Sequence, residues 1–116
     1  MTRVLVCGGR DFTDADYAFD VLDKLHSEIG ISTIIEGDAR GADEIAGQWA
    51  EARGIELEVY PANWEKYRAA AGPIRNKQML DEGKPDLVVA LPGGKGTANM
   101  AGQARDAGLE VREVFK

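Results

Sequence analysis

The sequence predicts an α/β fold, a single Rossmann-like open parallel sheet of about five strands with helices on both faces. Short runs rich in Val, Ile and Leu alternate with stretches of helical periodicity, and the links between them are short. Glycine-rich turns end several of the apolar runs, as happens where a parallel strand leads into a helix. Right-handed crossovers make all the strands parallel, and we expect the strand order 3-2-1-4-5.

Hydrophobic periodicity places the individual elements. The expected strands are residues 4–7, 33–35, 56–60, 87–91 and 109–114. The expected helices run from a cap at Thr13 or Asp14 to about Glu28, and over about 42–53, 74–81 and 97–107. Strand 56–60 alternates apolar and acidic residues, which is typical of a less buried edge strand. Residues 61–73 are expected to be irregular.

Length and charge limit the functions open to this chain. At 116 residues we expect one domain over residues 1–116. A net charge of −6 disfavours nucleic-acid and membrane-surface partners, which need a basic face. One Cys and one His argue against an intramolecular disulfide and against a metal site. The N-terminus lacks a signal-peptide pattern and no apolar run approaches ~20 residues, so we expect a cytoplasmic protein.

Three glycine-bearing turns follow the first, second and fourth strands. They are Gly8-Gly9-Arg10-Asp11, Gly37-Asp38-Ala39-Arg40-Gly41-Ala42-Asp43 and Pro92-Gly93-Gly94-Lys95-Gly96-Thr97. The carboxyl ends of parallel strands share one edge of the sheet, so we expect these turns to meet at the crevice between strands one and four. Glycine lets the backbone approach an anion closely, and the amides of a first helical turn point at the bound charge.

The charged residues of these turns predict a phosphate or pyrophosphate site. Each turn holds one cation, namely Arg10, Arg40 or Lys95. The turns also hold Asp11, Asp38 and Asp43, which can accept hydrogen bonds from ribose hydroxyls. The pattern is neither a Walker A loop nor a Gly-x-Gly-x-x-Gly fingerprint, which argues against an ATPase or an ordinary dehydrogenase. Each residue also has a simpler interpretation as part of a sharp turn or of a helix start.

The Pro92-Gly93-Gly94-Lys95-Gly96-Thr97 turn resembles the Pro-Gly-Gly-x-Gly-Thr-x-x-Glu motif of the LOG cytokinin-activating phosphoribohydrolases. The segments 8–12, 36–43 and 71–79 add to this resemblance. With them, the whole chain is similar to the YspA-type branch of the SLOG superfamily, which unites LOG-like and DNA-processing-protein-A-like Rossmannoid domains. The resemblance implies a small-molecule ligand derived from a nucleotide, with no other cofactor required. It also implies a homodimer or a higher homo-oligomer.

The resemblance carries a catalytic hypothesis as well. LOG enzymes break an N-glycosidic bond with an arginine before the motif strand and the glutamate that closes the motif. Arg75 stands at a position like that arginine, but Met100 stands at the glutamate position. A thioether can neither take a proton nor stabilise an oxocarbenium ion. Another carboxylate, such as Glu36, Asp38 or Asp43, could in principle serve from the neighbouring loop.

Three hypotheses about function therefore stay open. The first is a sensor or processing domain that binds a nucleoside monophosphate, ADP-ribose or an NAD-like compound. The second is a nucleotide N-glycosidase or phosphohydrolase with Arg75, Asp38 and Glu36 as its catalytic candidates. The third, single-stranded nucleic-acid binding, is disfavoured by the charge.

The remaining aromatic and sulfur-bearing residues have competing interpretations. Trp64 and Tyr67 either stack on a base or pack back onto the protein. Trp49 is expected in the core, His26 in solvent, and Cys7 as a buried thiol at the end of a strand. Two methionines, Met79 and Met100, are expected in the core or at a subunit interface.

Overall fold

The computed structural model describes residues 2–114 and confirms the predicted fold. One sheet of five parallel strands has the order β3-β2-β1-β4-β5. The strands are β1 (Thr2–Cys7), β2 (Ile31–Glu36), β3 (Glu56–Val59), β4 (Leu87–Ala90) and β5 (Glu110–Glu113). The single-domain expectation over 1–116 also includes residues 1, 115 and 116, which lie outside the described residues.

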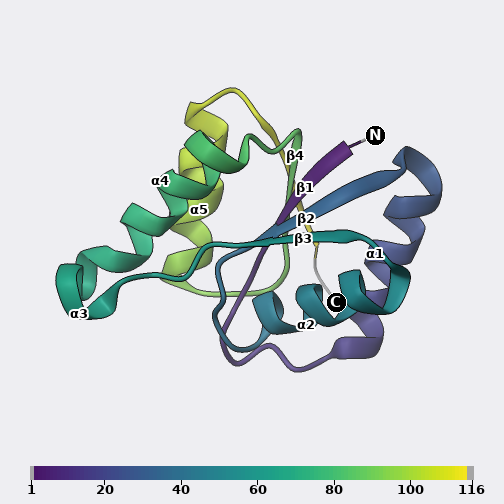
Figure 1. The fold of residues 1–116 in the computed structure, drawn as a ribbon, viewed down its shortest axis with the longest axis horizontal. Coiled ribbons are helices and arrows are strands. Elements are labelled where there is room, and N and C mark those ends of the chain that lie inside the picture. Colours follow the sequence, from purple (N-terminus) through teal and green to yellow (C-terminus); the bar gives the residue numbers. More distant parts are fainter. Residues whose placement is uncertain (1, 115–116) are drawn as a thin grey trace.

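Helices cover both faces of the sheet (Figure 1). The elements are α1 (Ala15–Ile29), α2 (Ala42–Arg53), α3 (Trp64–Tyr67), the 3₁₀ turn η1 (Arg68–Ala70), α4 (Ala71–Gly83) and α5 (Lys95–Asp106). α1 and α2 pack on one face, and α4 and α5 pack on the other. Within residues 2–114, none of the helices has the length and apolar character that crossing a bilayer requires.

The alternation of side chains along β1 divides the core into two layers. Val4 and Val6 face the layer of α1 and α2, whereas Leu5 and Cys7 face the layer of α4 and α5. Trp49 of α2 is completely buried in the first layer, as expected. β3 lies at an edge of the sheet, which agrees with its alternating acidic residues.

Local signals set several helix boundaries. Asp14 caps α1, because its carboxylate accepts a hydrogen bond from the Tyr17 amide at 3.1 Å. Gly54 ends α2 in the left-handed region at φ 68°. The segment 61–73 was expected to be irregular and is instead partly helical, since α3, η1 and the first turn of α4 fall in it. Pro73 lies inside that first turn, where no intrahelical donor is needed.

His26 corrects one expectation. Its Nδ1 atom accepts a hydrogen bond from the Ile31 amide at 2.9 Å. Its ring packs edge-on against Trp49, with the ring centroids 5.7 Å apart. The prediction of a solvated histidine was therefore wrong, because the end of α1 turns this side chain toward the start of β2.

Candidate functional site

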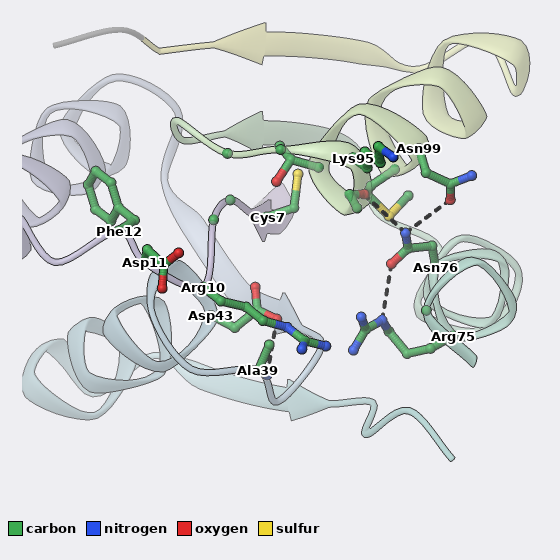
Figure 2. Close-up of a pocket in the computed structure, with 18 of the residues that line it drawn as sticks. Cys7, Arg10, Asp11, Phe12, Ala39, Asp43, Arg75, Asn76, Lys95 and Asn99 are labelled. Carbon is green, nitrogen blue, oxygen red and sulfur yellow. Dashed lines mark hydrogen bonds between the residues drawn. The ribbon is translucent and has the colours of Figure 1, made fainter. Parts of the chain in front are cut away.

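A pocket of about 1220 Å³ opens at the carboxyl edge of the sheet, beside the ends of β1 and β4. The connections from β1 and β4 lead to opposite faces of the sheet there, which leaves the crevice where open α/β sheets bind ligands. Typical small-molecule pockets measure roughly 300–1,000 Å³, so this one has room for a nucleotide or a dinucleotide. Its wall comes from the loop after β1, the start of α2, the segment α3–α4, and the loop into α5 (Figure 2).

Many of the residues singled out from the sequence meet in this pocket. Those that line it are Gly8, Gly9, Arg10, Asp11, Asp43, Arg75, Pro92, Gly93, Gly94, Lys95, Gly96 and Thr97. The turn after β2 contributes Ala39 and Asp43, whereas Glu36, Gly37, Asp38, Arg40 and Gly41 do not line the pocket. Arg40 is instead exposed and pairs with Asp11 at 3.4 Å. Asp38 is also exposed, and its φ of 59° marks it as a turn residue.

Gly9 joins the three turns into one structure. Its amide donates to the Pro92 carbonyl at 2.9 Å, and its own carbonyl accepts from the Ala42 amide at 3.1 Å. A Cβ atom on Gly41, where φ is +79°, would collide with the Gly9 carbonyl. A Cβ atom on Gly93 would collide with Thr97 and with the Gly9 amide. These glycines therefore allow the close packing that shapes the pocket edge.

The start of α5 presents backbone donors at the same edge. Gly94 is the N-cap residue and has no side chain to cap the helix. The amides of Lys95, Gly96 and Thr97 follow it in the first turn, where an α-helix offers no internal acceptors. Both Gly94 and Gly96 are exposed, and each has open space where a Cβ atom would be. This arrangement suits an anion.

Two arginines point toward one another across the pocket (Figure 2). Arg10 extends from the loop after β1, and Arg75 extends from α4. Burial lowers the pKa of Arg75, and the positive charge of Arg10 lowers it further, while the negative charge of Asp43 opposes this shift. An anion bound between the two guanidinium groups would stabilise the charged forms of both arginines.

A buried pair of carboxylates lies beneath the turn after β2. Asp43 accepts hydrogen bonds from the amides of Gly37 and Ala39, each at 3.2 Å, and burial raises its pKa to about 6. Glu36 accepts one from the Asp38 amide at 2.7 Å, and burial raises its pKa to about 7. Among the three carboxylates considered from the sequence as substitutes for the missing glutamate, Asp43 alone lines the pocket.

An amide network on the opposite wall was not foreseen. The Asn76 side chain is 4% exposed and donates to the Asn99 side-chain oxygen at 3.1 Å. Asn76 also accepts from Arg75 Nε at 3.0 Å, and Gln103 donates to Asn99 at 2.8 Å. The sequence pattern that could have predicted this network is Asn99 and Gln103, which lie one helical turn apart on α5 beside Met100.

Sulfur-bearing side chains form part of the pocket floor. Met79 and Met100 are 2% and 1% exposed, belong to the core as expected, and also line the pocket. Cys7 is buried beside them, and burial raises the pKa of its thiol to about 12. Within residues 2–114 no group of three or more His, Cys, Asp or Glu side chains is arranged to hold a metal ion.

Comparison with known proteins identifies the family. The model of the YAcAr family, described as the YspA, cpYpsA-related SLOG family, matches residues 2–67, more than half of the chain. The chain belongs to this family. It is also 36% identical over 119 residues to the Gene 61 protein of Mycobacterium phage D29, covering 96% of this chain and 94% of that protein. The predicted SLOG assignment is thus confirmed. The matched region includes the turns after β1 and β2 but not the one after β4.

Proposed function

We propose that this protein binds a phosphate-bearing nucleotide derivative in the pocket beside the ends of β1 and β4, as a sensor or processing domain. The ligand class is a nucleoside monophosphate, ADP-ribose or an NAD-like compound. The observation that carries the proposal is that Arg10, Arg75 and Lys95 line one pocket together with the exposed first turn of α5. In an acidic chain of net charge −6, such a local set of cations favours an anionic ligand.

The phosphate has two kinds of partner in this proposal. The first-turn amides of α5 donate hydrogen bonds to its oxygens, and the Lys95 ammonium adds a point charge beside them. In this proposal Arg10 and Arg75, which line the same pocket, hold a second phosphate or a ribose hydroxyl. A pocket of about 1220 Å³ accommodates the sugar and base that follow.

Native mass spectrometry tests this proposal. The protein is mixed with AMP, ADP-ribose, NAD and ribose 5-phosphate, and bound masses are recorded before and after denaturation. We expect retention of at least one nucleotide, and weaker retention by Lys95→Ala. The matched control is Lys77→Ala, because Lys77 is an exposed helical lysine outside the pocket that pairs with Asp81 at 2.6 Å. No bound nucleotide, or equal loss in both variants, would reject the proposed site.

Hydrolysis of the N-glycosidic bond is a second candidate function, and Asp43 is the observation that favours it. Its carboxylate lines the pocket, has a pKa raised to about 6, and carries its charge near Arg75. A carboxylate with such a pKa can take a proton from an attacking water near neutral pH. Of the residues proposed from the sequence, Arg75 keeps its place in this hypothesis, whereas Glu36 and Asp38 lie outside the pocket lining.

Chromatography of the nucleotide after incubation tests hydrolysis separately from binding. Turnover of AMP would release adenine and ribose 5-phosphate in equal amounts, and Asp43→Asn should abolish it. Asn can still accept from the Gly37 and Ala39 amides, so this variant keeps the loop contacts while removing the base. If the protein binds AMP but the AMP is still intact after long incubation, hydrolysis is rejected and only the binding function remains.

A further inference from the structure

Trp64 is an exposed aromatic residue that lines the pocket. It begins α3, a four-residue helix with no buried side chain, and it is 46% exposed. The structure also exposes Val59, Tyr67 and Ile74, but none of these three lines the pocket. An indole open to solvent on the wall of a pocket offers a flat apolar face, and covering that face with a ligand removes it from water.

The indole of Trp64 packs against α4. Asn63 caps the short helix that carries it, since the Asn63 side chain accepts from the Lys66 amide at 3.0 Å. A Cβ atom on Gly72 would lie 3.4 Å from the Cη2 atom of Trp64, so the ring rests against α4 at a glycine. This contact restricts the motion of the ring before binding, so less side-chain entropy is lost when a ligand stacks on it.

In the structure, the Arg10 side chain lies over the Trp64 ring. Its guanidinium carbon is 4.9 Å from the centre of the Trp64 ring. A guanidinium group is planar and stacks on aromatic rings much as a nucleobase does. The same Arg10 side chain lines the pocket opposite Arg75, where an anion would draw it. The ring face and the anion site are therefore connected by one side chain.

We propose that Trp64 is the base-binding residue of the pocket: the nucleobase stacks on its indole while Arg10 leaves the ring to contact phosphate. This inference rests on the proposed function, and it makes the ligand a phosphate compound that carries an aromatic base. Stacking on one face is tolerant of base identity, because every base has a π-face. Trp64 selects nucleotides over sugar phosphates.

Titration calorimetry with AMP, ADP-ribose and ribose 5-phosphate tests this assignment, since AMP and ribose 5-phosphate share the ribose and the phosphate and differ in the base. We expect Trp64→Ala to weaken AMP binding about tenfold, as removal of a stacking partner does, and to leave ribose 5-phosphate binding unchanged. Trp64→Phe should restore most of the AMP affinity. Tyr67→Ala is the matched control, because Tyr67 is an exposed aromatic residue of the same helix outside the pocket.

Fluorescence gives an independent readout. The chain has two tryptophans, and Trp49 is fully buried with its indole N–H bonded to Asp23 at 2.8 Å. AMP should therefore change the emission of the wild-type protein and leave that of Trp64→Phe unchanged. Equal affinity for AMP and ribose 5-phosphate, or an equal loss of both in Trp64→Ala, would overturn the role of Trp64 while leaving the phosphate site intact. No binding of any probe would instead overturn the proposed function.

Discussion

The Arg75 guanidinium donates a hydrogen bond to the backbone carbonyl of Gly37, which ties α4 to the turn after β2. The contact lies next to two buried carboxylates, Glu36 and Asp43, whose charges act on Arg75. Asp43 holds the amide of the same Gly37. The charge state of the carboxylates, the turn and the arginine that faces the pocket are thus coupled.

Stability should depend on pH through this carboxylate pair. Burial raises the pKa of Glu36 from 4.5 to about 7 and that of Asp43 from 3.8 to about 6, so the folded protein holds these protons more tightly than the unfolded chain. Their contribution to the free energy of unfolding is therefore largest below about pH 4 and is lost as the pH rises to about 7. Above that pH it stays constant.

Glu36→Gln tests this pH dependence by urea unfolding between pH 4 and pH 8. The variant should show a smaller fall in the free energy of unfolding across that range, by on the order of 1–3 kcal/mol. Glu44→Gln, on the exposed side of α2, is the matched control and should follow the wild type. A wild-type curve that rises over this range, with no difference in Glu36→Gln, would show that the folded-state pKa is not raised.

Arg75→Met should raise the pKa values of Glu36 and Asp43 further, because the Arg75 charge lowers both. It should also destabilise the fold by about 1–3 kcal/mol, since the Gly37 carbonyl loses its donor. Carboxyl carbon NMR titration measures the pKa values. Arg105→Met removes only an exposed pair with Glu113, at 3.2 Å, and serves as the control. Unchanged pKa values in Arg75→Met would disprove the coupling.

Two glycine-to-alanine changes should have opposite effects on stability. Gly41→Ala places a Cβ atom against the Gly9 carbonyl at a positive φ, and should cost about 2 kcal/mol or more. Gly102→Ala places one in open space inside α5 and should stabilise the protein by about 0.5–1 kcal/mol. Chemical unfolding of both variants measures the difference. Similar stability of the two would refute the close packing at Gly9.

Cys7 should be unreactive in the folded protein. Burial raises the pKa of its thiol to about 12, so almost no thiolate exists at pH 8. A thiol reagent such as 5,5′-dithiobis(2-nitrobenzoic acid) should label it only after unfolding in urea. Rapid labelling of the native protein would mean that the pocket floor opens at β1.

The sheet and its order followed from the sequence because strand runs and glycine turns are local patterns. The helical nature of residues 64–73 did not, because Pro73 resembles a helix boundary unless its place in the first turn is known. The sequence also could not predict which side chains at the end of β2 are buried. Glu36 is the last residue of β2 and Asp38 lies two residues further on, yet Glu36 is buried and Asp38 is exposed.

In the pocket, too, residues in local sequence patterns could be predicted, whereas contacts between distant segments could not. Arg10, Lys95 and the glycines after β1 and β4 were expected there from turns that share one sheet edge, whereas Arg75 was expected from the family resemblance. Arg40 was expected on the same reasoning but does not line the pocket. The hydrogen bond between the buried Asn76 side chain and the half-buried Asn99 depends on α4 meeting α5, which no local pattern encodes. Trp64 was ambiguous for the same reason, since its contact with Arg10 joins segments far apart in the sequence.

A nitrogen–proton correlation spectrum recorded during titration with ADP-ribose tests the central claim most directly. The account predicts the largest shifts at the amides of Gly9, Arg10 and residues 94–97, which line the pocket, and at the indole N–H of Trp64. Amides on α1 away from the pocket should not move. Shifts confined to other surfaces, or none at saturating ADP-ribose, AMP and NAD, would contradict a nucleotide site at this edge of the sheet.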